Sequence, residues 1–448
     1  MERRCFLSSS GLLSAGLITR GVSGTAVADS RPVDIRDRIE ALTQALPPAV
    51  QQARETALQI LKPTTKQLER GLRLHAESIV FDAYGFAPRS AVDQNRIKQL
   101  TDAGASDLEL DEAREDMMMT RCVSDPDEQR AFRESWNAAG VTCIFQNAGQ
   151  EGQDPSRLLR RLARFTWVTD MLREFTGKAV IPADIRQAHA DGRHMLYLTG
   201  NGIPLLQRWD TPEEELLNLR LFFQLGVRMM HLTYQRRNMI GDGCGESSNA
   251  GLSDFGRQAI RELNRNGIIP DCAHSGWQTS LEAAKASELP VVASHTTAAG
   301  IFPHIRSKPD NVIRAIADSG GYVGICCIPR FLRGKGDLNA FLDHIEYVAR
   351  RFGCEHVAIG TDVAAASPFR LPADGTVPPR RRRAAFRSLW PADSFSETPE
   401  MRNSISWTNW PMFTVGLVQR GFTDDEIRLI VGENVMRVAS QTLEAVTV

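Results

Sequence analysis

The sequence predicts an α/β protein folded as a (β/α)8 TIM barrel, on three observations. Short apolar runs alternate with amphipathic helical stretches, eight such units follow one another, and no GxGxxG motif follows any run. Alternation of strands with helices indicates parallel pairing, and eight units fit a closed barrel better than an open doubly wound sheet. The missing glycine motif argues against a dinucleotide-binding sheet.

Each predicted strand is a short, nearly continuous apolar run, as expected where helices cover a parallel sheet. The runs occupy residues 78–83, 141–146, 194–199, 227–233, 267–274, 289–295, 321–327 and 356–362. Amphipathic stretches between most of them predict the outer helices. These stretches occupy residues 155–175, 212–225, 254–266, 277–287, 309–319 and 338–352.

The first 28 residues predict a twin-arginine signal peptide. Arg3 and Arg4 precede a mildly apolar segment, residues 11–19, and the small residues Ala26-Val-Ala28 supply a cleavage pattern. The apolar segment is too short to span a bilayer, so no transmembrane segment is expected. We therefore expect export of the folded protein to a periplasmic or extracytoplasmic location.

The rest of the chain is expected to form one catalytic domain with additions. Residues 29–74 have a helical pattern and predict an N-terminal extension, and residues 75–440 hold the barrel. Residues 367–408 form a long insertion rich in Pro, Arg and Trp before the final helix. Such long irregular loops are usually functional or disordered, so this one is expected to act as a lid or a subunit contact.

The composition is that of an ordinary soluble globular protein. Of 448 residues, 42% are hydrophobic and 24% charged, and the net charge is -1, which gives no basic face for nucleic acid. The cationic run Arg380–Arg383 is read as a solvated loop. Eight cysteines are scattered without CxxC pairs, so neither a disulfide framework nor a structural zinc site is expected.

Two successive predicted strands end on a histidine, His274 and His295. A single histidine would most simply cap its strand, but a repeat at the same point of neighbouring units places two imidazoles in one barrel mouth. Neutral imidazoles there can ligate one divalent cation, and Asp362, which ends the last strand, can act as general base on a water molecule. This pattern predicts metal-assisted hydrolysis.

Several motifs occur in order around the predicted barrel and resemble those of the membrane (renal) dipeptidase family, peptidase family M19, of the amidohydrolase superfamily. They are Gly251-Leu-Ser-Asp-Phe-Gly256, Asp271-x-x-His274, Ser294-His295, Arg306-x-x-Pro309-Asp310, Gly360-Thr-Asp362 and Gly432-x-Asn434-x-x-Arg437. The resemblance runs from about residue 79 to residue 438.

The resemblance implies a (β/α)8 enzyme with a dinuclear zinc centre that cleaves dipeptides, and it implies a homodimer. By motif, His274 and His295 match the two histidines of the second zinc, and Asp362 matches the catalytic acid/base. Arg306 matches the arginine that holds the substrate carboxylate, a role that suits a bidentate guanidinium.

Three elements of the family's site are missing from this sequence. Tyr84 and Phe86 stand where the family has a His-x-Asp zinc pair, and Asn201 replaces a bridging glutamate. Tyr234 replaces a histidine that polarises the substrate carbonyl. Because a neutral amide is a poor zinc ligand, a dinuclear centre is not expected.

The sequence-based hypothesis is an exported hydrolase of dipeptides or related small amides that holds at most one divalent metal, zinc in the first instance. His274 and His295 are the expected ligands, with Asp82 as an additional candidate, and Tyr234 and Asn201 join Arg306 in substrate binding. Two alternatives stay open. One is a metal-free binding protein on the same barrel, and the other is a lyase or isomerase using His274 and Asp362 as an acid/base pair.

Overall fold

The computed structural model describes residues 33–149, 155–369 and 393–445. The predicted signal peptide, the run Arg380–Arg383 and most of the predicted insertion lie outside the described residues. Within the described ranges, no helix combines the length and the apolar character that crossing a lipid bilayer requires.

The centre of the fold is a set of short parallel strands, each buried along most of its length. Eight of them correspond to the predicted runs: β1 (Phe81–Gly85), β2 (Cys143–Asn147), β4 (His194–Gly200), β5 (Val227–His231), β6 (Ile269–Asp271), β7 (Ala293–Ala298), β9 (Val323–Ile325) and β10 (Val357–Ile359). Two further strands, β3 (Thr176–Lys178) and β8 (Ser307–Lys308), pair with β4 and β7. The sequence did not predict these two, because two or three residues are too few to show a period.

The strands form two hydrogen-bonded sheets that meet at two seams. One sheet has the order β1-β2-β4-β5-β6, and the other has the order β10-β9-β7-β8. A parallel bridge between Asp271 and Val292 joins β6 to β7. At the second seam, the Asp362 N–H donates to the Tyr84 carbonyl over 2.9 Å, which brings the end of β10 to β1. The predicted barrel is therefore confirmed, with strand order β1-β2-β4-β5-β6-β7-β9-β10.

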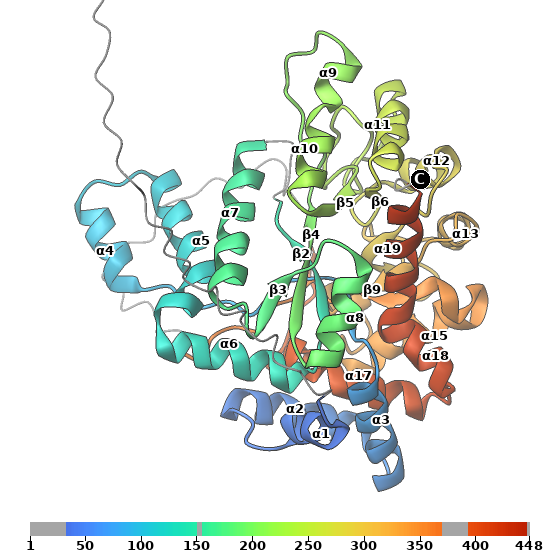
Figure 1. The fold of residues 1–448 in the computed structure, drawn as a ribbon. Helices are drawn as coiled ribbons and strands as arrows, with labels where there is room; N and C mark the ends of the chain where they lie inside the picture. Colours follow the sequence, from blue (N-terminus) through green and yellow to red (C-terminus); the bar gives the residue numbers. More distant parts are fainter. Residues whose placement is uncertain (1–32, 150–154, 370–392, 446–448) are drawn as a thin grey trace, which may run out of the picture.

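Helices surround the strands, and most connect one strand to the next (Figure 1). They are α4 (Gln94–Asp102), α5 (Asp107–Ser124), α6 (Pro126–Ala139), α7 (Pro155–Met171), α8 (Pro182–Asp191), α9 (Pro212–Leu216), α10 (Asn218–Gln224), α11 (Asp254–Arg265), α12 (Trp277–Ala286), α13 (Asp310–Asp318), α14 (Pro329–Leu332), α15 (Leu338–Phe352), α16 (Pro399–Ser404), α17 (Trp410–Gln419), α18 (Asp424–Arg428) and α19 (Asn434–Glu444). Local signals set their ends. In α6, Asp125 caps the first turn and Gly140 ends the helix in the left-handed region at φ 61°.

Three N-terminal helices, α1 (Ile35–Thr43), α2 (Pro48–Leu61) and α3 (Thr65–Glu77), lie together at the bottom of Figure 1 beside α17. Gly71 allows α3 to pack closely against α17, because a Cβ at this position would overlap Val415 of α17. His75 fixes the same corner, with one ring nitrogen 2.8 Å from the Thr414 hydroxyl and the other 2.8 Å from the Ala139 carbonyl.

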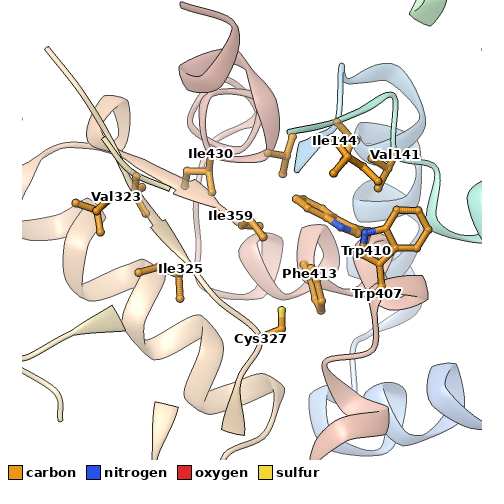
Figure 2. Close-up of a cluster of buried hydrophobic side chains, with 14 of the residues drawn as sticks. Val141, Ile144, Val323, Ile325, Cys327, Ile359, Trp407, Trp410, Phe413 and Ile430 are labelled. Carbon is orange, nitrogen blue, oxygen red and sulfur yellow. The ribbon is translucent and has the colours of Figure 1, made fainter. Parts of the chain in front are cut away.

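Two apolar cores hold the barrel. Outside the strands, the side chains of Trp407, Trp410 and Phe413 pack with strand residues such as Ile359 (Figure 2). Inside the barrel, Phe81 stacks on Phe145 with ring centroids 5.2 Å apart, and the Phe145 ring lies 5.0 Å from that of Tyr197. The aromatic inner layer fills the barrel below the carboxyl ends of the strands, so the interior is a packed floor rather than a channel.

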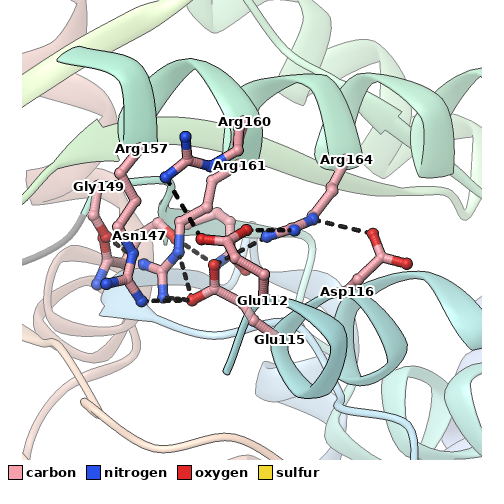
Figure 3. Close-up of polar contacts among 10 residues, drawn as sticks. Glu112, Glu115, Asp116, Asn147, Gly149, Arg157, Arg160, Arg161 and Arg164 are labelled. Atoms are coloured by element: carbon pink, nitrogen blue, oxygen red, sulfur yellow. Dashed lines mark hydrogen bonds and ion pairs between the residues drawn. The ribbon is translucent and has the colours of Figure 1, made fainter. Parts of the chain in front are cut away.

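A network of charged residues joins α5 to α7 (Figure 3). Glu115 of α5 contacts Arg157, Arg161 and Arg164 of α7, and Arg161 also donates to the Gly149 carbonyl, just after β2. Burial alone would raise the pKa of Glu115, but the hydrogen bond from Arg161 and the charges of all three arginines outweigh it and lower the pKa to about 2. The network therefore ties the loop after β2 to the outer helices.

We predict that Glu115→Gln lowers the free energy of unfolding by about 3 kcal/mol, because it leaves half-buried guanidinium groups without their carboxylate. Urea unfolding followed by circular dichroism measures this loss. Glu134→Gln is the matched control: Glu134 is 40% exposed and lies 4.0 Å from Arg130, so its loss should stay within about 0.5 kcal/mol. Equal losses in both variants would contradict a special role for Glu115.

The stabilisation by Glu115 should also depend on pH. Because its folded-state pKa is lowered from 4.5 to about 2, the contribution is fully present above the unfolded value and is lost as the pH falls through about 2. The difference in unfolding free energy between the wild type and Glu115→Gln should therefore shrink between pH 5 and pH 2. A difference that stays constant over this range would exclude the ion-pair explanation.

Candidate active site

One cavity of about 270 Å³ opens among the carboxyl ends of the strands. Five residues predicted for the site line it together: Asn201, Tyr234, His274, Arg306 and Asp362. Tyr84 and Asn147, which also follow predicted strands, complete much of the polar lining. The volume suits a small molecule, and the site lies where barrel enzymes carry out their chemistry.

His274 and His295 lie side by side as the sequence predicted. His274 lines the cavity, and His295 is completely buried beneath it, with the two Nε2 atoms 3.0 Å apart. Burial, followed by the charge of Arg306, holds the pKa of each imidazole well below its usual value. Both rings are therefore neutral near pH 7, which is the form that binds metal ions.

The outer ring nitrogens of this pair have defined partners. His274 Nδ1 lies 3.1 Å from Gln235 Oε1, which can only accept, so Nδ1 carries the proton. His295 Nδ1 lies 2.9 Å from the Ser294 hydroxyl, which donates its own proton to Asp271 and so accepts from the ring. In this assignment, both Nε2 atoms present lone pairs toward one point, as in histidine pairs that hold a metal.

The Asp271 carboxylate organises the ends of β6 and β7. Its Oδ1 accepts from the backbone N–H groups of Ala273 (2.9 Å) and Ser294 (3.0 Å), and its Oδ2 lies 3.0 Å from His231 Nε2. Burial would raise the pKa of Asp271, but the charge of His231 and the hydrogen bonds from Ser294 outweigh it and lower the pKa. The carboxylate therefore stays ionised inside the barrel and fixes the segments that carry both histidines.

A third histidine, His231 at the end of β5, completes a cluster that the sequence analysis missed. The candidate ligand atoms of His231, His274 and His295 all lie within 4.8 Å of one another, and all three rings are buried. Among the described residues this is the one such group of His, Cys, Asp or Glu side chains. Imidazole nitrogens are ligands for zinc or a similar divalent ion, and a three-histidine set leaves a coordination position open for water or substrate. The ring nitrogens of His231 lie 3.0 Å from Asp271 Oδ2 and 3.2 Å from the Gly200 carbonyl oxygen, so this ring would have to give up one of these contacts to bind a metal.

Tyr84 and Asn201 occupy the place where the family pattern has metal ligands. The Tyr84 hydroxyl donates to Asn201 Oδ1 over 2.7 Å, and its ring stacks on His295 with centroids 3.8 Å apart. Burial raises the pKa of Tyr84 well above its usual value, so the hydroxyl keeps its proton. A neutral hydrogen bond therefore stands where the family pattern has charged ligands.

Asp82 lies away from the histidine cluster, contrary to its suggested role as an additional ligand. Its carboxylate accepts hydrogen bonds from the Thr361 backbone (2.9 Å), the Thr361 hydroxyl (2.6 Å) and the Trp407 indole (3.1 Å). The reason is a bulge in β1 between Asp82 and Gly85, which turns Tyr84 into the barrel while Asp82 faces Trp407. Asp82 therefore ties β1 to the end of β10, and burial raises its pKa to about 7.

The Arg306 guanidinium is fully buried at the cavity and has no carboxylate within ion-pair distance among the described residues. It donates to the Ala273 carbonyl and, over 3.0 Å, to the His295 carbonyl, while its Nε has no hydrogen-bond partner. The charge lies 5.6 Å from the centre of the Phe331 ring. An uncompensated buried cation of this kind is expected to attract an anionic ligand group.

Asp362 and Tyr234 complete the cavity walls. Asp362 has a left-handed backbone conformation with φ 58°, which is uncommon for a residue with a side chain and costs roughly 1 kcal/mol or more. Tyr234 stacks on His274 with ring centroids 4.0 Å apart. The backbone of Asp362 and the ring of Tyr234 therefore have defined positions at the rim of the histidine cluster.

Two glycines permit the close spacing behind His295. A Cβ at Gly324 of β9, or at Gly360 after β10, would overlap the carbonyl oxygen of Ser294. The neighbouring strands can therefore approach Ser294 closely, and this residue links His295 to Asp271.

The comparisons with known proteins agree with one another. A family model described as membrane dipeptidase (peptidase family M19) matches residues 68–370. A curated relative, dipeptidase tcpJ of Claviceps purpurea, is 27% identical over 225 residues, which is 49% of this chain and 46% of the relative. The chain thus matches about half the length of such relatives.

Two solved structures from Pseudomonas aeruginosa share the fold. One, described as an amidohydrolase, has a TM-score of 0.60 at 24% identity and covers 83% of this chain and 98% of its own. The other, described as the probable dipeptidase PvdM, has a TM-score of 0.60 at 16% identity and covers 85% and 99%. At these identities the likeness concerns the fold.

We predict that Tyr84→Phe lowers the free energy of unfolding by about 1 to 2 kcal/mol, because buried Asn201 Oδ1 loses its donor. Denaturant unfolding provides the measurement. Tyr322→Phe is the matched control, since the buried Tyr322 hydroxyl has no hydrogen-bond partner in the described structure and its removal should cost little. If both variants lost the same stability, the Tyr84 hydroxyl would have no structural importance.

Proposed function

The chain belongs to the membrane dipeptidase family, peptidase family M19, and from this we propose that it hydrolyses the amide bond of a dipeptide or a related small N-acyl amino acid. The observation that carries the proposal is the single cavity lined by Arg306, His274 and Asp362. It combines an anchor for a carboxylate, a histidine cluster suited to a metal ion, and a carboxylate suited to proton transfer.

Arg306 is proposed to hold the substrate carboxylate. Its charge is buried and lacks a protein carboxylate among the described residues, and its remaining N–H groups can form a bidentate pair. A substrate carboxylate bound here would supply the missing countercharge. The bound end of the substrate is thereby fixed relative to His274 and Asp362.

His274 and His295, with His231 as third ligand, are proposed to hold one divalent ion, zinc in the first instance. The second partners of the imidazoles, Gln235 and Ser294, orient the rings for this role. When bound, such an ion polarises a carbonyl and lowers the pKa of a coordinated water molecule.

Asp362 is proposed as the acid/base of the reaction. It takes a proton from the water molecule that attacks the amide carbon, and it returns this proton to the leaving nitrogen as the C–N bond breaks. The hydrogen bond from its N–H group to the Tyr84 carbonyl and its left-handed backbone hold the carboxylate at the cavity. Tyr234, stacked on His274, lies beside the same cavity and is proposed to contact the substrate carbonyl.

One feature supports a second candidate, a metal-free binding protein on the same barrel. Tyr84 and Asn201 bond to each other, so two positions that carry metal ligands in the family pattern are neutral and paired. Such a protein would keep the Arg306 anchor without hydrolysis. Metal content separates the two candidates before any substrate is known.

We predict about one divalent ion per chain in full-length protein purified without chelator, measured by inductively coupled plasma mass spectrometry. His274→Ala and His295→Ala should each lose most of the ion, and His231→Ala should lower its affinity. His356→Ala is the control, because this ring bonds the Gly321 carbonyl outside the cluster. Metal-free wild-type protein after incubation with zinc would favour the binding protein.

We predict that Asp362→Asn lowers kcat by about 10² to 10⁴ with little change in metal content, as expected for loss of a general acid/base. Turnover of a dipeptide panel, including D-residues at the carboxyl side, and of N-acyl amino acids provides the readout. Asp102→Asn, at an exposed surface pair with Lys98, is the control and should leave kcat unchanged. Metal-loaded protein without turnover across the panel would refute hydrolysis.

A further inference from the structure

A second cavity, of about 620 Å³, adjoins the proposed catalytic cavity. Phe86 and Asp362 line both cavities, so the carboxylate residue stands at their junction. The walls of the second cavity come from the segment after β1, the segment after Asp362, and α5. A substrate that reacts beside Asp362 therefore has space on two sides, and the proposed Arg306 anchor accounts for only one of them.

Arg89 provides the second cavity with a cation that forms no ion pair with a described carboxylate, and the charges of Asp362 and Glu115 act on it only from beyond that distance. Its side chain is solvent-exposed, and no carboxylate of the described residues lies within ion-pair distance of its guanidinium. The contact that holds the group is a cation–π interaction, with the guanidinium carbon 4.5 Å from the centre of the Phe86 ring. Stacking of this kind covers one face of the guanidinium and leaves the N–H groups at its edge available for an anion.

The other arginine of this cavity differs in this respect. Arg114 of α5 donates to Asp111 over 3.4 Å, so its charge already has a partner. Arg330 in the first cavity likewise pairs with Glu397 over 3.2 Å. Among the cavity arginines, Arg306 and Arg89 are therefore the two without a carboxylate partner in the described structure.

The backbone fixes Arg89 relative to Asp362. The Arg89 N–H donates to the Ala365 carbonyl over 2.9 Å, and the Ser367 N–H donates to the Arg89 carbonyl over 2.9 Å. These bonds form a parallel bridge between the segment after β1 and the segment that begins at Asp362. The backbone of Arg89 therefore has a fixed place relative to that of Asp362, and stacking on Phe86 limits the freedom that the guanidinium loses when it binds an anion.

We propose that the Arg89 cavity is a subsite for a second carboxylate, so that the substrate carries an acidic group on each side of the scissile amide. The expected class is a dipeptide with an acidic amino-terminal residue or an amino acid acylated by a dicarboxylic acid. Arg306 binds the carboxyl-terminal carboxylate, and Arg89 binds the acidic group of the acyl side. This inference rests on the proposed function, because it takes Asp362 as the reacting position and Arg306 as the first anchor.

The test compares two probes that differ in one carboxylate, N-succinylglycine and N-acetylglycine. Binding is measured by isothermal titration calorimetry on the full-length, metal-loaded chain carrying Asp362→Asn, which prevents turnover. In this background we expect N-succinylglycine to bind about tenfold more tightly, the lower range for a charge-assisted hydrogen bond at a partly exposed site. Adding Arg89→Met should make the two dissociation constants equal by weakening N-succinylglycine alone.

Two further variants distinguish binding at Arg89 from a diffuse positive potential of the cavity and from binding at the Arg306 anchor. Arg114→Met removes a paired cation from the same cavity and should keep the ratio of the two dissociation constants within about twofold. Arg306→Met should weaken both probes by a similar factor, because both carry the glycine carboxylate.

Equal affinities in the starting protein, or a preference that persists in Arg89→Met, would overturn the subsite. A preference lost equally in Arg114→Met would also overturn it, since a diffuse positive potential would then explain the data. If Arg89→Met removed the preference but Arg306→Met changed neither affinity, the subsite would stand and the proposed Arg306 anchor would fail. If neither probe bound, both proposals would be rejected.

Discussion

The site depends on one buried carboxylate, that of Asp271. The two sheets meet at the seam between β6 and β7, where a single parallel bridge joins them, and the carboxylate adds side-chain bonds across this seam. It accepts hydrogen bonds from Ala273, just after β6, and from Ser294 on β7, so it couples the positions of the segments that carry His274 and His295. Its burial would be costly without these donors, and they keep it ionised. The relative position of the two imidazoles thus depends on the hydrogen bonds that the Asp271 carboxylate accepts across the seam between β6 and β7.

The barrel mouth has neutral side chains, those of Tyr84 and Asn201, at positions where the family pattern has charged ones, and this makes its net charge more positive. Tyr84 and Asn201 satisfy each other with one neutral hydrogen bond, so they bring no negative charge to the histidine cluster. Neither Arg306 nor Arg89 forms an ion pair with a described carboxylate. The mouth is therefore better suited to anions than a site built from several carboxylates would be, and it retains a cluster of three histidines.

The sequence was sufficient for the barrel and for most of the residues around its mouth. All eight barrel strands were predicted because apolar runs and helical periods are local properties, and strand ends of one barrel share one face. His274, His295 and Asp362 were brought together on that basis, whereas Arg306 was identified only through the resemblance to the family motif. Asp82 was misplaced, because the β1 bulge depends on pairing with β2 and leaves no period-two signal in a five-residue strand. His231 was overlooked inside an apolar run, although a lone imidazole among buried strand residues was a signal that could have been read.

Gly324 and Gly360 have a consequence for how this scaffold can change. The strand spacing behind His295 depends on the absence of side chains at these two positions, because a Cβ at either glycine would overlap the Ser294 carbonyl oxygen. The side chains that line the mouth and the glycines that set the strand spacing beneath it are therefore separate residues. Residues at the mouth, such as Tyr84 and Asn201, can therefore differ from the family pattern without any change in the diameter of the barrel.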